Sequence, residues 1–122
     1  MAQSGTSPFP IVYKICTRAA WQEAIRHGAF RGSADDRRDG FIHFSAAHQL
    51  AETARKYFHG QHDLVLVSID PATLGPALRW EPSRGGALFP HLYGPLPMRA
   101  VKWMRPLPVG ADGLHVFPHM DD

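Results

Sequence analysis

The sequence has 122 residues and only one cysteine, Cys16, which excludes an intramolecular disulfide and any multi-cysteine zinc module. No stretch approaches the ~20 apolar residues of a membrane span. The first ten residues have neither the basic start nor the apolar run of a signal peptide. Thirteen Lys and Arg stand against eleven Asp and Glu, and a net charge of +2 is too small to indicate nucleic acid or anionic lipid as a partner. These absences predict a cytoplasmic protein that does not bind membranes.

Several cofactor and catalytic motifs are also absent. The chain has no glycine-rich dinucleotide fingerprint, no Walker loop, no Gly-x-Ser-x-Gly elbow and no His-Glu-x-x-His zinc motif. Of the eight histidines, His43, His48 and His91 are candidates for a shared metal, but without a ligand motif we predict no metal site. We likewise expect Cys16 to be a buried apolar filler rather than a nucleophile.

The composition is that of an ordinary globular domain, with 44% hydrophobic and 20% charged residues. The chain contains no internal repeat, low-complexity tract or linker. We therefore predict one domain over residues 11–107. A flexible arm at 1–10 precedes it, and a tail at 108–122, able to dock on the domain, follows.

Two helices are predicted from capping residues and apolar spacing. Thr17 is placed as the N-cap of the first helix and Gly28 as its end, with an apolar face formed by Trp21, Ala24 and Ile25. Residues 29–40 are polar and predict an exposed loop. Ser45 is placed as the N-cap of the second helix, which Gly60 ends, with an apolar face formed by Leu50, Ala54, Tyr57 and Phe58.

Short strands are predicted between and after these helices. The continuous apolar run at 64–69 indicates a central strand covered on both faces. The prolines within 88–95 place that segment at a sheet edge or a bulge, because proline donates no ladder hydrogen bond. Other strands are expected at 11–16, 41–44, 78–81 and 100–107. The sum is an α+β fold with two main helices and a mixed or antiparallel sheet.

His43 and Ser45 form the first candidate site. Strand alternation puts both on one face, with Ile42 and Phe44 on the core face. The expected helix N-terminus beside them would suit a phosphate or carboxylate, on which His43 could act as acid, base or donor. The alternative is that His43 is a polar spacer on a half-buried sheet face.

The second candidate site contains His91 and Tyr93, which share a strand face and carry polar tips on planar rings. Arg84 adds a cation on the preceding glycine turn. The alternative is an exposed edge strand that prolines protect from pairing. Glu81 is a further candidate, either positioning a ribose hydroxyl or pairing at the surface with Arg79 or Arg84.

Taken together, these blocks resemble a known family. The chain closely resembles the small bacterial family called domain of unknown function 952 over about residues 11–105. The resemblance is carried by Tyr13-Lys14-Ile15, Trp21, the 39–45 block DGFIHFS, Gln49, the 63–70 strand, Trp80-Glu81 and the 89–96 block FPHLYGPL.

The family looks similar in fold to the ADP-ribosyltransferase superfamily, whose split sheet holds NAD or an ADP-ribosylated intermediate. The resemblance implies first-motif residues at Tyr13 and Lys14, second-motif residues at His43 and Ser45, and Glu81 as the late acidic residue. The cofactor is otherwise unknown, with NAD implied by resemblance alone.

The leading hypothesis is a cleft for a nucleotide-like or phosphate-bearing ligand, to which Lys14 and Arg84 supply positive charge. One alternative is an active ADP-ribosyltransferase or RNA 2′-phosphotransferase. Another is a non-enzymatic module that binds a protein partner. All three readings depend on the imidazoles of His43 and His91 facing one hollow.

Overall fold

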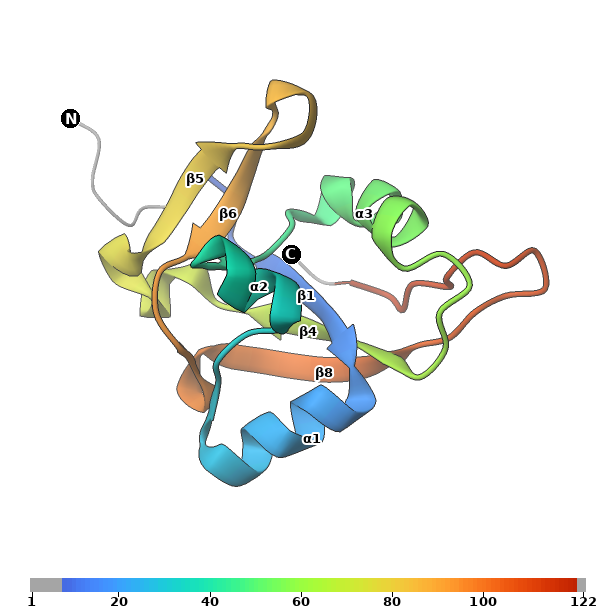
Figure 1. Ribbon diagram of the computed structural model, residues 1–122, viewed down its shortest axis with the longest axis horizontal. Coiled ribbons are helices and arrows are strands. Elements are labelled where there is room, and N and C mark those ends of the chain that lie inside the picture. Colours follow the sequence, from blue (N-terminus) through green and yellow to red (C-terminus); the bar gives the residue numbers. More distant parts are fainter. Residues whose placement is uncertain (1–7, 121–122) are drawn as a thin grey trace.

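The computed structural model describes residues 8–120, apart from the side chain of Arg84. Its first sheet is antiparallel, with the strand order β1-β4-β8 (Figure 1). These strands span Val12–Thr17, Leu64–Ile69 and Val101–Leu107. Every residue of β4 is buried, which confirms the predicted central strand.

The second sheet is also antiparallel, with the order β3-β6-β5, and a short β2-β7 pair lies apart from it. These strands span Ile42–His43 (β3), Leu88–Leu92 (β6), Leu78–Pro82 (β5), Ala29–Phe30 (β2) and Leu96–Pro97 (β7). A single bridge between Tyr13 and Ser45 joins β1 to the chain leaving β3, so the two three-stranded sheets meet there. The fold is α+β with antiparallel sheets, as predicted.

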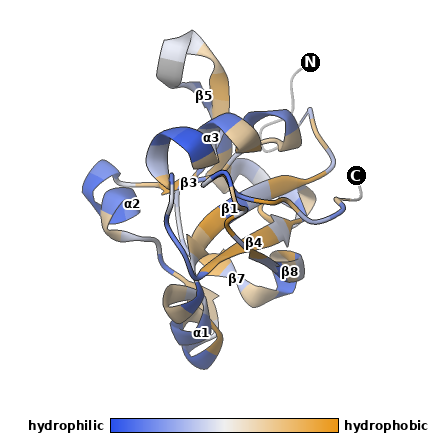
Figure 2. Cartoon of the chain, turned by 90° about the vertical axis from the view of Figure 1, so that its right-hand side faces the viewer, coloured by the Kyte–Doolittle hydropathy of each residue, from blue (hydrophilic) through white to orange (hydrophobic). Residues whose placement is uncertain are grey.

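Two apolar clusters fill the interior. One packs residues of β1 and β4, such as Val12 and Val67, against Ile42 and Phe44, as alternation predicts. The other packs Tyr13 and Leu66 with residues of α3. Figure 2 shows hydrophobic residues along β1 and β4, while α2 is largely hydrophilic.

Helix α1 (Arg18–His27) begins and ends as predicted. The Thr17 side chain accepts a hydrogen bond from the Ala20 amide, and Gly28 ends the helix in the left-handed conformation. The expected apolar face is wrong at Ile25, which is 55% exposed. Trp21 and Ala24 make the buried face, and Ile25 lies about 100° further round the helix from Ala24.

Residues 29–40 are not the predicted exposed loop. They contain β2 and the helix α2 (Ala34–Asp39), so the described chain has three α-helices rather than two. Ser33 and Asp36 form a reciprocal capping box, each side chain accepting from the other residue's backbone amide. Two satisfied amides and a buried Asp36 stabilise a helix that has no apolar face of its own.

The prediction that Ser45 caps the next helix is wrong. Its backbone exchanges two hydrogen bonds with Tyr13, of 2.8 and 2.9 Å, so the chain is still extended at this point. A 3-10 turn, Ala47–Gln49, follows and leads into α3 (Leu50–Tyr57). The helix ends at Tyr57, before the predicted Gly60, and Tyr57 is exposed rather than apolar-packed.

The edge position predicted for residues 88–95 is also wrong, because β6 lies between β3 and β5. Pro90 fits there because β3 ends at His43. The Phe44 amide donates to the Pro90 carbonyl at 2.9 Å, and the missing proline N–H falls where the ladder stops.

The segments flanking the sheets make contacts where they are described. The predicted arm at 1–10 lies mostly outside the described residues, but Phe9 lies 5.4 Å, between ring centroids, from both His48 and Trp80. In the tail, Phe117 packs against the second apolar cluster. No helix within residues 8–120 is long and apolar enough to cross a membrane.

Cys16 lies buried in β1, and burial raises the pKa of its thiol to about 12. Because the thiolate is the reactive form, we expect no modification by a thiol reagent in the native state near neutral pH, and full modification in denaturant. Mass spectrometry of both samples checks this. Rapid labelling of the native protein would show that Cys16 is accessible.

Candidate functional site

A cleft of about 430 Å³ opens where the two three-stranded sheets meet. Residues of β1, α2, β3, α3 and β6 line it, and Figure 1 shows α2 in front of β1 with α3 to its upper right. The volume lies in the range of small-molecule sites. The lining residues used below are Lys14, Asp36, Asp39, His43, Ser45 and His91.

His43 and His91 lie side by side in this cleft. They are direct partners in the antiparallel pairing of β3 with β6. Cross-strand partners project to the same face of a sheet. The two imidazole centroids are accordingly 5.5 Å apart, in an edge-on arrangement. Residues nearly fifty positions apart in sequence therefore share one hollow.

Asp36 fixes the position of His43. One Asp36 oxygen, Oδ1, accepts from the His43 backbone amide at 3.1 Å and lies 2.6 Å from His43 Nδ1. The Lys14 ammonium donates to both Asp36 oxygens, at 2.8 and 3.1 Å, and to the His43 carbonyl at 3.0 Å. The side chains of Lys14 and Asp36 are 7% and 1% exposed, so this ion pair is buried.

Asp36 remains ionised despite its burial. Burial alone would raise the pKa of Asp36, but the hydrogen bond with His43 and the charge of Lys14 outweigh it. The pKa of Asp36 is therefore held well below its usual range. An ionised carboxylate only accepts hydrogen bonds, so His43 Nδ1 carries a hydrogen.

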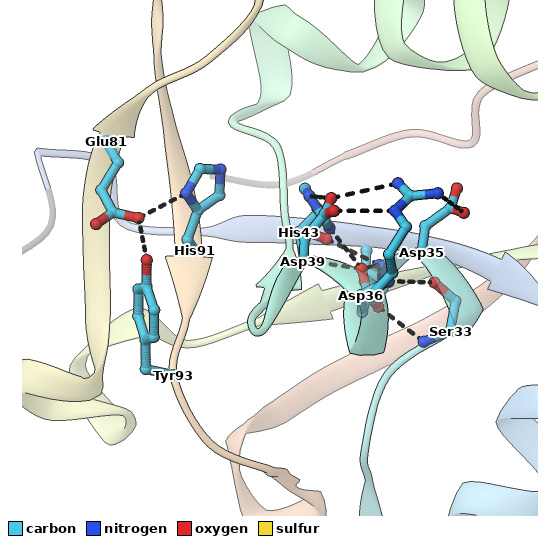
Figure 3. A network of polar contacts seen from close by, with 10 residues as sticks. Ser33, Asp35, Asp36, Asp39, His43, Glu81, His91 and Tyr93 are labelled. Carbon is cyan, nitrogen blue, oxygen red and sulfur yellow. Dashed lines mark hydrogen bonds and ion pairs between the residues drawn. The ribbon is translucent and has the colours of Figure 1, made fainter.

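The second nitrogen of His43 also faces a carboxylate. His43 Nε2 lies 3.0 Å from an Asp39 oxygen, and Arg38 in turn bonds Asp39 (Figure 3). The hydrogen bond with Arg38 lowers the pKa of Asp39, which is therefore ionised. His43 Nδ1 therefore donates to Asp36, while Nε2 faces the Asp39 carboxylate.

His91 is held differently. Its Nδ1 lies 2.8 Å from Glu81 Oε1, and the Tyr93 hydroxyl donates to the same oxygen at 2.7 Å. The Phe41 ring stacks on His91, with centroids 4.1 Å apart, and also contacts His43 and Tyr93. These contacts fix both the plane and the direction of the His91 ring.

The protonation of His91 follows from these contacts. The hydrogen bonds with His91 and Tyr93 lower the pKa of Glu81, so Glu81 is an acceptor and His91 Nδ1 is the donor. Burial lowers the pKa of His91 despite the opposing effect of Glu81, which favours the neutral ring. The neutral ring then carries a bare Nε2.

His91 Nε2 is buried and has no hydrogen-bond partner among the described residues. Figure 3 shows it turned away from Glu81, toward the side where His43 and Asp39 lie. An unsatisfied buried acceptor costs about 1–3 kcal/mol. The cleft thus contains a donor imidazole and an acceptor imidazole next to each other.

The other predicted site residues are divided between the cleft and its surroundings. Tyr13 lines the cleft but is fully buried. Ser45 also lines it, with its hydroxyl 3.1 Å from that of Thr53. Glu81 and Tyr93 lie behind His91 and do not line the cleft. The side chain of Arg84 lies outside the described part of the structure.

Sequence reasoning missed Asp36, Asp39 and Phe41. The pattern Ser33-x-x-Asp36 was the available signal, because a hydroxyl followed three residues later by a carboxylate marks a helix start. A lysine within the apolar first strand was a second signal, since a buried ammonium requires a partner. Within residues 8–120, no group of three or more His, Cys, Asp or Glu side chains could hold a metal ion.

A comparison with known protein families matches the part of the chain that contains the motifs around the cleft. The family described as "Protein of unknown function (DUF952)" matches residues 15–104, which include His43, Glu81 and His91. The chain belongs to the DUF952 family. This confirms the family resemblance inferred from the sequence. A comparison with curated proteins found no match.

Solved structures similar to this DUF952 chain include those of protein CC0527 from Caulobacter crescentus. Its X-ray structure has 50% sequence identity and a TM-score of 0.84, and the match covers 87% of this chain and 93% of that one. Its solution NMR structure has 50% identity and a TM-score of 0.79, covering 87% and 91%. The DUF952 fold described above is therefore shared with an experimentally determined relative.

Proposed function

We propose that the cleft binds a polar small molecule of nucleoside or nucleotide size, through a hydroxyl or N–H group that donates to His91 Nε2. The observation that carries the proposal is the buried, unpartnered Nε2 of a histidine that lines the cleft. A ligand donor would satisfy this acceptor and remove its desolvation cost. Glu81 keeps the hydrogen on Nδ1, so the acceptor is preorganised for the ligand.

The charges around the cleft favour the nucleoside part of such a ligand over its phosphate. The Lys14 ammonium is compensated by Asp36, and Arg38 is shared between Asp35 and Asp39. No free cation among the described lining side chains is thus left for an anion. Hydroxyl and ring-nitrogen groups suit the acceptors and donors present.

NAD and ADP-ribose are the compounds that we place first. The proposal includes the ADP-ribosyltransferase-like arrangement that the family resemblance implies. It is supported by the two three-stranded antiparallel sheets, whose backbones are joined within the described residues by the bridge between Tyr13 and Ser45, beside the cleft.

Amide NMR spectra of the ¹⁵N-labelled protein test the proposal, with NAD, ADP-ribose and adenosine titrated separately. We expect saturable shifts concentrated at Asp39, Ser45, Thr53 and His91. Shifts confined to other surfaces, or none at millimolar ligand, would contradict the proposal.

Catalysis is a second candidate, favoured by the pairing of a donor imidazole with an acceptor imidazole in one cleft. In NAD cleavage, a water oxygen would bond to the ribose carbon while the bond to nicotinamide breaks. The leaving group takes the bond electrons, and the proton of the water passes to His91. Nicotinamide release that depends on His91 is the expected result. Binding of NAD without nicotinamide release would show that the protein binds NAD but does not cleave it.

A further inference from the structure

A second hollow, of about 240 Å³, adjoins the cleft. Asp36 lines both hollows. Phe41, which lines the second, stacks on His91, which lines the first. A ligand in the cleft therefore lies close to the second hollow.

Two arginines line this second hollow. The side chains of Arg31 and Arg37 are exposed, and neither guanidinium forms an ion pair or hydrogen bond within the described part of the chain. Some exposed arginines are paired, such as Arg26 with Glu23 and Arg55 with Glu52, whereas Arg79 and Arg99 form no ion pair in the described part of the chain. The two arginines of the hollow thus have no carboxylate to neutralise them.

The remaining charge in the hollow is already compensated. Asp36 lines it too, but its carboxylate is 1% exposed and bonds both Lys14 and His43. Pairing Asp36 with Lys14 leaves the two guanidinium groups as the uncompensated charges of the hollow. The second hollow is therefore positively charged, whereas the lysine and arginine that line the cleft are paired with carboxylates.

The backbone leaves open space at two glycines that line the hollow. Gly40 and Gly94 both line the hollow, and a Cβ at either position would meet nothing within 4 Å. Gly40 has a φ of 87°, which ends α2 in the left-handed conformation and turns the chain into Phe41. A ligand can thus approach the backbone on a side that carries no side chain.

We infer that the second hollow is an anion subsite, in which Arg31 and Arg37 hold a phosphate or carboxylate group. Planar guanidinium groups suit both anions, because they offer two parallel donors to two oxygens. The subsite goes beyond the proposed function, since it stands on its own charges. One further idea, that a single ligand occupies both the cleft and the subsite, rests on the proposed function.

Inorganic phosphate and acetate are the first probes, titrated separately into the ¹⁵N-labelled full chain. We expect saturable phosphate shifts at Gly40, Phe41 and Gly94, weakened about tenfold or more in the double variant Arg31→Gln/Arg37→Gln. The matched control is Arg26→Gln/Arg55→Gln, which removes the same charge from helix surfaces. Equal weakening by both double variants would overturn the subsite, as would shifts scattered over all basic surfaces.

Acetate distinguishes the two anions: tighter binding of phosphate identifies a phosphate subsite, and tighter binding of acetate a carboxylate subsite. ADP-ribose and adenosine then separate this inference from the proposed function. Arg31→Gln/Arg37→Gln should weaken ADP-ribose about tenfold or more and leave adenosine unchanged. Unchanged ADP-ribose binding would overturn the link between the hollows. Failure of both compounds, with phosphate still bound, would overturn the proposed function but support the subsite.

Discussion

Replacing Asp36 with alanine is expected to lower the free energy of unfolding by about 3–5 kcal/mol, because the variant leaves the Lys14 ammonium buried without a counter-charge. The same change removes the side-chain half of the capping box and frees the His43 ring. Urea denaturation followed by circular dichroism measures the loss.

Two further variants isolate the buried pair. Asp35→Ala removes a neighbouring, exposed carboxylate that, within residues 8–120, bonds Arg38 only, and it should cost about 0–1 kcal/mol. Lys14→Met/Asp36→Leu removes both charges and should be more stable than Asp36→Ala alone. If the double variant loses as much stability as the single changes Lys14→Met and Asp36→Leu lose together, the ion pair is not the source of the effect.

The contribution of Asp36 should also depend on pH in a definite direction. Its folded pKa lies below the unfolded value of about 3.9, so its stabilisation is present above that pH and is lost as the pH falls below it. The stability difference between the wild-type protein and Asp36→Asn is therefore expected to shrink in acid. A difference that stays constant from neutral pH to strong acid would contradict this prediction.

His91→Phe is expected to weaken binding of a cleft ligand by about 5- to 150-fold, because the ligand donor then loses its acceptor. A phenyl ring can still stack on Phe41, so a fold change in affinity separates recognition from packing. Calorimetric titration with ADP-ribose or adenosine measures the effect, and thermal denaturation confirms that the variant is folded.

Tyr93→Phe is the matched control for His91→Phe. It removes only the hydroxyl that donates to Glu81 and leaves the bond between Glu81 and His91 in place. We expect an affinity within a few-fold of the wild-type value. An equal loss of affinity in both variants would mean that Glu81, His91 and Tyr93 affect binding only by maintaining the local structure.

The two histidines could be found from sequence because each lies in a compact block of chemically distinctive residues. Alternation correctly put Ile42 and Phe44 in the core, and the apolar run at 64–69 correctly indicated the central strand. What sequence could not supply was the register of β3 with β6, which pairs His43 with His91. Long-range pairing of this kind leaves no local pattern.

The failures have the same physical origin. Residues 29–40 look like a loop because α2 has no apolar stripe, and it is held instead by Asp36, which bonds Lys14 in a strand 22 residues earlier. A proline such as Pro90 is unfavourable in a central strand only where the partner strand continues beside it. Here β3 ends at His43, so Pro90 has no ladder hydrogen bond to lose. In both cases a distant contact decides the local structure.

The proposed recognition of a ligand by His91 requires that the ring hold its hydrogen on Nδ1 and leave Nε2 bare. Long-range ¹H–¹⁵N spectra of the histidine rings report this directly, first in the free protein and then as ADP-ribose is added. We predict a neutral His91 protonated at Nδ1, with the Nε2 signal moving on saturation toward that of a hydrogen-bonded acceptor. A hydrogen found on Nε2, or an Nε2 signal that does not move while the ligand binds, would contradict the proposal.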